Sequence, residues 1–353
     1  MNSMLWDEGM ILTEQRFRLI GRRDERRDPL RLFWVGSGIT MTAKLRDLTA
    51  RIKAEWSEQS PWMSVMIDGA PVARFPLRRG LHTYAILTGM DPSAAHRVSL
   101  TRDIQPMEND ERLAVRLRGL EMDGELLEQQ PRMLIEFIGD SLTSGEGLAG
   151  PKSAAEWKTV WMSGTQTYGA QVCAMLDAEG EWVSQSGWGV VTDWTGERSH
   201  TLPAIYDQVC ALHEAGREAY GFTAHPVDAV VINLGTNDMS ALNALPPEEQ
   251  PSHEEEIVTT VCGFLRHIRA VRPGVPILWV CGMCGNDLNA LLQRAVTEAA
   301  WAMADDSIAF LSLPACAPEE LGSLGHPGWL SHKRCAELIA AWLKERIEKP
   351  SAM

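Results

Sequence analysis

From residue 126 to the carboxyl terminus, short apolar runs alternate with helix-length segments, and this rhythm constrains the fold more than any other feature of the sequence. The runs are apolar along most of their length, as expected of strands that are buried on both faces of a sheet. They lie at 132–139, 227–235, 275–282 and 308–314, and the helical segments lie at 167–180, 254–271, 288–304 and 331–349. The pattern predicts a parallel sheet covered by helices in an α/β/α arrangement.

The first third of the chain has a different pattern of apolar and turn-forming residues. Residues 10–125 contain short β-type runs separated by turn signals, among them Asp68-Gly69 between two apolar runs. An Asp-Gly pair in that position is typical of a tight β-hairpin. We therefore predict two domains, a jelly-roll-like antiparallel β-sandwich in residues 1–125 and the parallel-sheet domain in residues 126–353. The polar segment 120–133 is expected to connect them.

The charge balance restricts the partners of the protein. The net charge of −14 and the pI of about 5.1 argue against nucleic acid or an anionic membrane as a partner. No stretch approaches the roughly 18 uninterrupted apolar residues of a transmembrane helix, and the first residues lack the basic start and apolar run of a signal peptide. We therefore expect a cytoplasmic protein whose seven scattered cysteines are reduced.

One cysteine pair, Cys281 and Cys284, has the CxxC spacing found in zinc and redox sites. The sequence has no second pair of this kind and no histidine pair nearby, and the motif follows an apolar run. A structural role with reduced thiols is the favoured interpretation, and a cleft-lining position at the strand end stays open.

Small and polar residues follow the apolar runs where the predicted strands end. The sequence GDSL follows the first run at residues 139–142, and GTND follows the next at residues 235–238. Gly187 lies between these two runs, and His326 and His332 lie beyond the last run. Ligands of parallel sheets bind beyond the carboxyl ends of the strands, so we expect one site there. A serine nucleophile, a histidine base and amide donors are the parts of an acyl-transfer site.

In this order, the four segments resemble the four blocks of the SGNH (GDSL) hydrolase superfamily. The resemblance implies that Ser141 is the nucleophile and His326 the base. It also implies an oxyanion hole formed by the backbone N–H groups of Ser141 and Gly187 and by the side-chain amide of Asn237. Such a mechanism requires no metal and no cofactor.

A closer resemblance is to family 2 of the carbohydrate esterases. It rests on a β-sandwich placed ahead of the SGNH domain and on the segments AHRVSLTR, GDSLTSGEG, QTYGAQVCAMLDAE, SGWGV and HPGWLSH. The resemblance implies an O-acetyl esterase whose substrates are acetylated plant polysaccharides or oligosaccharides such as xylan and mannan. A lipid or thioester hydrolase and a non-catalytic carbohydrate-binding protein are the alternatives. The sandwich domain either binds glycan or walls the cleft, and the resemblance implies the second.

One position departs from the superfamily pattern. Many members carry an aspartate three residues before the histidine, where this chain has Ser323. An uncharged serine cannot give an imidazolium the electrostatic support of a carboxylate. We expect a backbone carbonyl to orient His326 instead, with Glu319 or Glu320 as the alternative.

Other residues near these motifs have simpler expected roles. His332 is expected at the start of the last helix, and Asp140 and Asp238 are expected to bond loop amides. The chain has thirteen tryptophans, and aromatic faces suit sugars, although most tryptophans are buried packing. We expect one or two of the tryptophans near the motifs to contact sugar, with Trp188 and Trp329 as the candidates among Trp157, Trp161, Trp188, Trp194 and Trp329.

Overall fold

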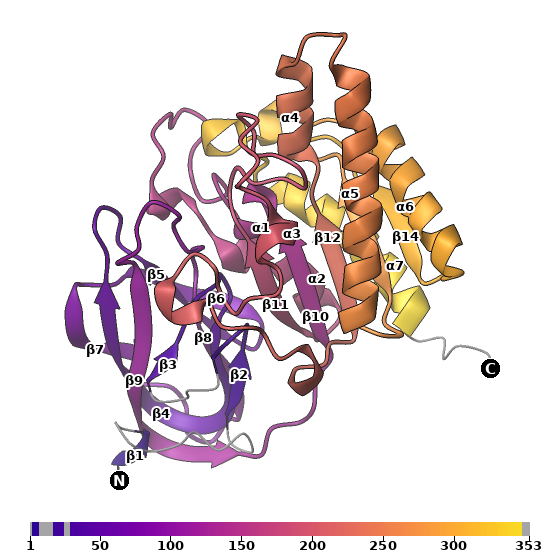
Figure 1. The fold of residues 1–353 in the computed structure, drawn as a ribbon. Helices are drawn as coiled ribbons and strands as arrows, with labels where there is room; N and C mark the ends of the chain where they lie inside the picture. Colours follow the sequence, from indigo (N-terminus) through magenta and orange to yellow (C-terminus); the bar gives the residue numbers. More distant parts are fainter. Residues whose placement is uncertain (1, 7–16, 25–28, 348–353) are drawn as a thin grey trace. The chain divides into compact units, whose positions relative to one another are not determined.

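The structure is a computed structural model, and it describes residues 2–6, 17–24 and 29–347 (Figure 1). These residues form two compact units. The amino-terminal unit comprises the chain up to Arg132 together with Lys158–Val160 and Gln208–Tyr220, and the carboxyl-terminal unit comprises the rest. Two short segments from later in the sequence thus belong to the first unit. No helix within the described ranges is long and apolar enough to cross a membrane.

The amino-terminal unit is an antiparallel β-structure with its own apolar core. The long strand β4 organises it, because β4 pairs with β9 along one edge and with β8 and then β7 along the other. Buried side chains of β4 alternate with more exposed ones along much of the strand, and the buried ones enter a core shared with β5, β8 and β9. The strands are β1 (Asn2–Trp6), β2 (Arg18–Ile20), β3 (Leu30–Arg31), β4 (Gly38–Glu55), β5 (Trp62–Ile67), β6 (Ala70–Pro76), β7 (Gly80–Leu87), β8 (His96–Arg102) and β9 (Ala114–Leu127).

The predicted hairpin at Asp68-Gly69 is confirmed. The strands β5 and β6 flank it as an antiparallel pair, and the two turn residues have φ values of 53° and 85°. The polar connection predicted at 120–133 is wrong over its first part, since β9 continues to residue 127 and pairs with β1 and β4. The polar residues made this part of β9 look like a connection, although they occupy the more exposed positions of the strand. Leu120 and Met122, which alternate with them, are buried in the core.

The carboxyl-terminal unit contains the predicted parallel sheet, in the strand order β11–β10–β12–β13–β14. Its strands are β10 (Leu134–Gly139), β11 (Glu179–Ser184), β12 (Ala229–Asn233), β13 (Ile277–Cys281) and β14 (Ile308–Ser312). Its α-helices are α1 (Ser141–Ser144), α2 (Tyr168–Met175), α3 (Leu202–Ile205), α4 (Thr236–Ala244), α5 (Gln250–Val271), α6 (Asn289–Met303) and α7 (Trp329–Ile347). Short 3₁₀ turns occur at Thr159–Trp161, Gly164–Gln166, Glu214–Gly216, Phe222–Ala224, Pro318–Glu320 and Ser323–Gly325.

Helices cover both faces of this sheet (Figure 1). Phe137 on β10 packs against Tyr168 on α2 with ring centroids 6.1 Å apart, and Trp279 on β13 packs against Phe264 on α5 at 6.5 Å. The strand register puts Phe137 and Trp279 in adjacent rows, so their side chains point to opposite faces of the sheet. The helix α7 packs with α2, and α6 packs with α5. The predicted α/β/α arrangement is therefore confirmed.

The sequence pattern does not predict β11. Its sequence, EGEWVS, carries two glutamates in 6 residues, and both are buried. The carboxylate of Glu181 lies 3.6 Å from Arg272, whose Nε donates to Glu136 on β10 at 2.9 Å. The buried guanidinium of Arg272 is thus shared by Glu181 and Glu136. This pairing offsets the free-energy cost of desolvating a carboxylate, which otherwise keeps acidic residues out of buried strands.

Candidate active site

Ser141 lies at the carboxyl end of β10, inside the parallel sheet. The strand β10 is flanked by β11 and β12, and Ser141 begins the short helix α1 directly after it. Asp140 caps this helix, because its carboxylate accepts a hydrogen bond from the N–H of Leu142 at 3.0 Å. Ser141 is 6% exposed, and its hydroxyl makes no hydrogen bond to any residue that the structure describes. The hydroxyl is therefore available to a reacting group.

Asn237 reaches the same place from the carboxyl end of β12. It is the second residue of α4, and its Nδ2 donates to the carbonyl of Trp188 at 2.8 Å. The same Nδ2 lies 3.4 Å from a carboxylate oxygen of Asp140. Gly187 precedes Trp188 with a φ of 81°, a left-handed conformation that favours glycine. These contacts place Asn237 and the Gly187–Trp188 segment beside the residue that precedes Ser141.

Asp238 fixes the loop that carries Gly187. Its carboxylate accepts hydrogen bonds from the N–H groups of Val190 and Val191 at 2.7–3.0 Å. Burial raises the pKa of Asp238 above its usual range, and the bonds from these N–H groups oppose the rise. Asp238 and Asp140 therefore both bond loop amides, as expected from the sequence.

Asp140 is a fully buried carboxyl group next to the serine. Desolvation raises its pKa to about 7, its bond to Leu142 opposes the rise, and the charges of Asp238 and Glu146 add to it. A partly protonated Asp140 places less negative charge beside Ser141 than an ordinary aspartate does. This favours a site in which negative charge develops on a reacting oxygen.

The loop that carries His326 packs directly on the loop that follows Ser141. The carbonyl of Gly147 accepts hydrogen bonds from the N–H of Ser323 at 3.0 Å and from its hydroxyl at 3.3 Å. Gly147 has a φ of 73°, and a Cβ atom there would lie 2.8 Å from the Cβ of His326 and 2.4 Å from the carbonyl oxygen of Ser323. Only glycine permits this approach, so the last glycine of GDSLTSGEG brings the histidine loop to the serine loop.

A backbone carbonyl faces the ring of His326. Its Nδ1 lies 3.3 Å from the carbonyl oxygen of Leu324, which is the carbonyl arrangement expected from the sequence. Leu324 has a φ of 57°, and a left-handed non-glycine residue costs on the order of 1 kcal/mol, so the surrounding loop holds this carbonyl against strain. Ser323 is fully buried and bonds the serine loop, and Glu320 pairs with Arg334.

His332 has a different environment. It lies in the first turn of α7, fully buried, and its Nδ1 accepts a hydrogen bond from the N–H of Tyr168 on α2 at 3.0 Å. Burial, together with the nearby His326, lowers the pKa of His332 to about 3. A histidine that stays neutral to so low a pH is a poor acceptor for a serine proton, and its expected structural role at the helix start fits this environment.

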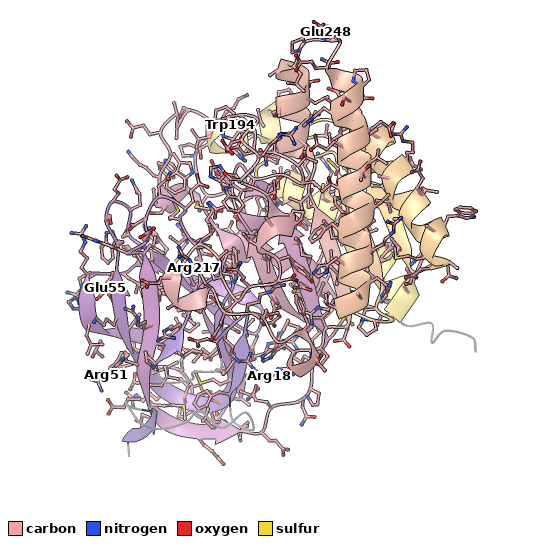
Figure 2. The ribbon with its side chains drawn as sticks, viewed as in Figure 1. Arg18, Arg51, Glu55, Trp194, Arg217 and Glu248 are labelled. Atoms are coloured by element: carbon pink, nitrogen blue, oxygen red, sulfur yellow. The ribbon has the colours of Figure 1, made fainter. Side chains whose placement is uncertain are left out.

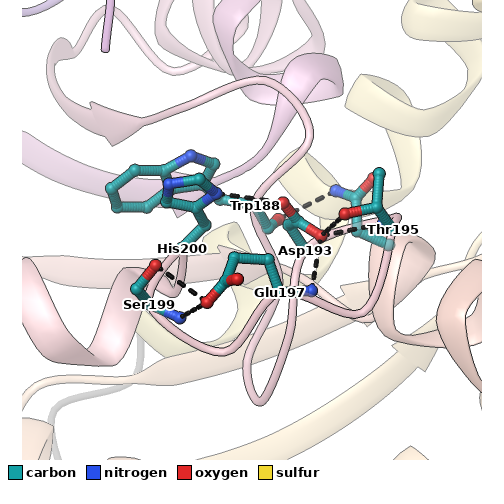
Figure 3. Close-up of polar contacts among 7 residues, drawn as sticks. Trp188, Asp193, Thr195, Glu197, Ser199 and His200 are labelled. Carbon is teal, nitrogen blue, oxygen red and sulfur yellow. Dashed lines mark hydrogen bonds and ion pairs between the residues drawn. The ribbon is translucent and has the colours of Figure 1, made fainter.

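The two tryptophans selected as candidate sugar contacts have different surroundings. Trp188 is 4% exposed, and its ring stacks on His200 with centroids 5.2 Å apart (Figure 3). Its ring is therefore part of the packing of this loop. Trp329, at the start of α7, is 44% exposed, and the Nζ of Lys333 lies 5.5 Å from the centroid of its ring. Of the two, Trp329 offers an accessible aromatic surface.

A tight turn beside Gly187 presents another tryptophan. One carboxylate oxygen of Asp193 accepts hydrogen bonds from the N–H groups of Thr195 at 2.8 Å and Glu197 at 2.9 Å (Figure 3). Trp194 lies inside this turn and is 62% exposed (Figure 2). The backbone N–H of Trp194 donates a hydrogen bond to the carbonyl of Gly187 at 3.0 Å. The sequence DWTGE carries the signal for such a turn, because aspartate bonds the backbone two residues on.

The two cysteines of the CxxC motif differ in exposure, since Cys281 is buried and Cys284 is exposed. No group of three or more metal-ligating side chains occurs in the described part of the chain, and all seven cysteines are free thiols. Cys281 ends β13 at 2% exposure, and burial raises its pKa to about 12. At neutral pH this thiol is protonated and unreactive, which agrees with the structural interpretation.

The site therefore has a serine at the end of a central parallel strand, amide donors from two neighbouring loops, and a histidine from a loop that touches the serine loop. This combination on an α/β/α sheet defines a serine hydrolase of the SGNH type. The chain belongs to the GDSL-like lipase/acylhydrolase family, whose model matches residues 137–332.

Several solved structures that are similar to this chain are family two carbohydrate esterases, which confirms the predicted resemblance. An acetyl xylan esterase from the rumen bacterium Butyrivibrio proteoclasticus superposes with a TM-score of 0.92 at 28% identity, covering 99% of this chain and 98% of that one. A family two carbohydrate esterase from Clostridium thermocellum, in complex with cellohexaose, shares the fold with a TM-score of 0.82 at 22% identity, covering 94% and 99% of the two chains.

Curated relatives carry related names. The cellulase/esterase CelE of Acetivibrio thermocellus is 24% identical over 329 residues, which cover 89% of this chain and 37% of that protein. An acetylxylan esterase / glucomannan deacetylase of Cellvibrio japonicus is 27% identical over 199 residues, which cover 55% of this chain and 52% of that protein. The matches thus span about a third to a half of the length of these relatives.

Proposed function

We propose that this chain is an O-acetyl esterase that removes acetyl groups from acetylated plant polysaccharides or oligosaccharides of the xylan or mannan type. The observation that carries the proposal is the contact of the serine and histidine loops at Gly147, next to an asparagine bound to the Gly187–Trp188 segment. The names of the similar esterases, which include acetyl xylan and glucomannan, supply the substrate class.

In the first step, the Oγ of Ser141 attacks the carbonyl carbon of the acetyl group while His326 accepts the hydroxyl proton. The resulting oxyanion receives hydrogen bonds from the N–H groups of Ser141 and Gly187 and from the Nδ2 of Asn237. The Nδ2 of Asn237 donates to Trp188 at 2.8 Å and to Asp140 at 3.4 Å, and we assign the hydrogen of the longer bond to the oxyanion. The tetrahedral intermediate then collapses, and the sugar oxygen leaves with the proton from His326.

In the second step, water attacks the carbonyl carbon of the acetyl-serine while His326 takes a proton from the water. The bond between this carbon and the serine oxygen then breaks, His326 returns the proton to the serine oxygen, and acetate leaves. To take the proton, the ring must have its Nε2 unprotonated. The carbonyl of Leu324 supports this tautomer because it accepts only from a protonated Nδ1. It also supports the imidazolium through a dipole where other members use a carboxylate.

The sugar chain needs an accessible surface beside the oxyanion hole. Trp194 is exposed and joined to Gly187 by a hydrogen bond, and Trp329 is exposed at the start of the helix that follows His326. We assign these two rings to the sugar, because a flat aromatic face matches the apolar face of a pyranose. Trp188 then supports the loop from within.

Asn237→Ala should lower kcat for an acetylated oligosaccharide by about 10²–10³-fold and change KM little, since the amide acts on the oxyanion rather than on the bound sugar. Steady-state kinetics of acetate release measure both values. Asn243→Ala is the matched control, because Asn243 is an exposed residue of the same helix and should leave kcat unchanged. A loss confined to KM would contradict the oxyanion role of Asn237.

A substrate panel tests the proposed activity. We expect acetate release from acetylated xylan, mannan and glucomannan oligosaccharides, and a preference for 4-nitrophenyl acetate over longer acyl esters. A rising rate with acyl chain length would assign the site to a lipid or thioester hydrolase instead. Sugar binding without release of nitrophenol would identify a non-catalytic carbohydrate-binding protein.

A further inference from the structure

The amino-terminal unit contains a cavity of about 1110 Å³ that shares no residue with the candidate active site. Ligand pockets measure roughly 300–1,000 Å³, so this cavity has room for several linked sugar rings. Its walls come from segments that are far apart in the sequence but belong to this one unit.

One wall is formed by the segment Gln208–Tyr220, which lies between α3 and β12 in the sequence. The buried indole of Trp34 donates to the carbonyl of Val209 at 2.6 Å. Arg22 donates to the carbonyl of Gln208 at 3.0 Å and lies 4.4 Å from the ring centroid of Tyr220. The segment is thus anchored at both ends within the unit, and it is held as a defined wall of the cavity.

Two of the arginines in the lining already pair with carboxylates of the same lining. Arg31 pairs with the buried Asp24, and Arg116 lies 3.2 Å from Glu55. His213 is uncharged, because burial and the neighbouring arginines lower its pKa to about 4, and its Nδ1 accepts a backbone N–H. These lining groups are polar, but their charges are already paired, so they do not require a ligand of opposite charge.

Other charged groups of the lining are exposed and available to a ligand. Four exposed side chains of the lining make no hydrogen bond or ion pair to any described residue, namely Glu111, Arg112, Glu214 and Glu218. The half-buried ring of Trp56 lies in the same lining, with the guanidinium of Arg79 5.2 Å from its centroid. The lining thus combines unpaired acceptors, an unpaired donor and an aromatic surface.

We propose that this cavity of the amino-terminal unit is a second glycan-binding site, which holds a stretch of neutral oligosaccharide. An anion would meet the unpaired carboxylates of Glu111, Glu214 and Glu218. These outnumber the guanidinium groups of Arg79 and Arg112, which pair with no described carboxylate. An apolar ligand would leave all these polar groups without partners. Each hydroxyl of a neutral sugar both donates and accepts, so it satisfies carboxylates and guanidinium groups alike. The ring of Trp56 adds an apolar surface for the sugar. The site stands on its own lining and does not depend on the esterase activity.

Binding to the whole chain, carrying Ser141→Ala, tests the proposal. With 5-fluorotryptophan incorporated, the ¹⁹F signal of Trp56 is assigned by its loss in Trp56→Phe. Titration with xylohexaose or mannohexaose, neither acetylated, should shift this signal saturably. Arg112→Ala should weaken the binding measured at this signal by about tenfold, the effect of losing one well-used contact. Arg46→Ala, which changes an exposed arginine on β4 outside the lining, should leave it unchanged.

A Trp56 signal that stays still while other tryptophan signals respond would overturn the proposal. An equal response to an oligogalacturonate would also overturn it, because the lining would then bind anions. These outcomes are separate from those of the proposed function. Loss of acetate release would refute the esterase assignment and leave the Trp56 titration valid, and a silent Trp56 in an active esterase would refute only the second site.

Discussion

Ser141→Ala should lower kcat for acetate release from acetylated xylan and mannan oligosaccharides by about 10⁵-fold. Without the Oγ atom no acetyl-enzyme forms, and the remaining groups only assist a direct attack by water. The melting temperature should change little, because alanine is favourable at the first position of α1. The hydroxyl that is removed also makes no hydrogen bond to any described residue. Initial rates of acetate release and a thermal melt measure the two effects.

Ser144→Ala is the matched control, because Ser144 lies in the same short helix. Its hydroxyl is fully buried and donates to the hydroxyl of Ser184 at 2.8 Å. Losing this bond should cost about 1 kcal/mol of stability and leave kcat within a few-fold of the wild type. Retention of more than a tenth of the activity in Ser141→Ala would mean that another residue is the nucleophile. Equal losses of kcat in both variants would point to damage of α1.

The proximity of the loops that carry Ser141 and Asn237 was predictable from the sequence. Parallel strands end at one edge of a sheet, so motifs that follow β10 and β12 converge there whatever the details of packing. The orientation of His326 was open between a carbonyl and a carboxylate. The backbone of Leu324 and the bond from Ser323 to Gly147 decide it, and both depend on a loop contact that local sequence does not reveal.

The exposure of the tryptophans near the site shows a related limit of the sequence. Trp188 and Trp194 lie in the same loop, and their residue type gives no reason to choose between them. Their exposure is decided by the stacking of Trp188 on His200 and by the Asp193 turn, which turns Trp194 to the surface. The turn has a recognisable sequence, whereas the stacking partner does not.

For the fold, the runs of mostly apolar residues identified four of the five strands of the parallel sheet. They did not identify β11, because the burial of Glu181 depends on Arg272, which is contributed by a distant part of the chain. They also did not identify the Gln208–Tyr220 segment as part of the first unit. One of its anchors is a hydrogen bond between Trp34 and Val209, which are 175 residues apart. Elements that depend on long-range polar partners leave no periodic signal.

His326→Ala should lower kcat by about 10⁵-fold, as Ser141→Ala does, because the serine hydroxyl is a weak nucleophile without a base. The double variant should be no slower than either single variant, since the two groups act as one unit in the same step. Kinetics on 4-nitrophenyl acetate and on an acetylated oligosaccharide measure this non-additivity. Losses that multiply in the double variant would mean that His326 and Ser141 act independently.

His332→Asn separates chemistry from folding in this region. Asparagine keeps an acceptor for the N–H of Tyr168 but leaves part of the buried space unfilled, so the protein should lose about 1–2 kcal/mol of stability. Its kcat should stay within a few-fold of the wild type, because a histidine with a pKa of about 3 takes no part in the proton transfer. If kcat falls in His332→Asn and holds in His326→Ala, the base is the buried histidine and the assignment of His326 is wrong.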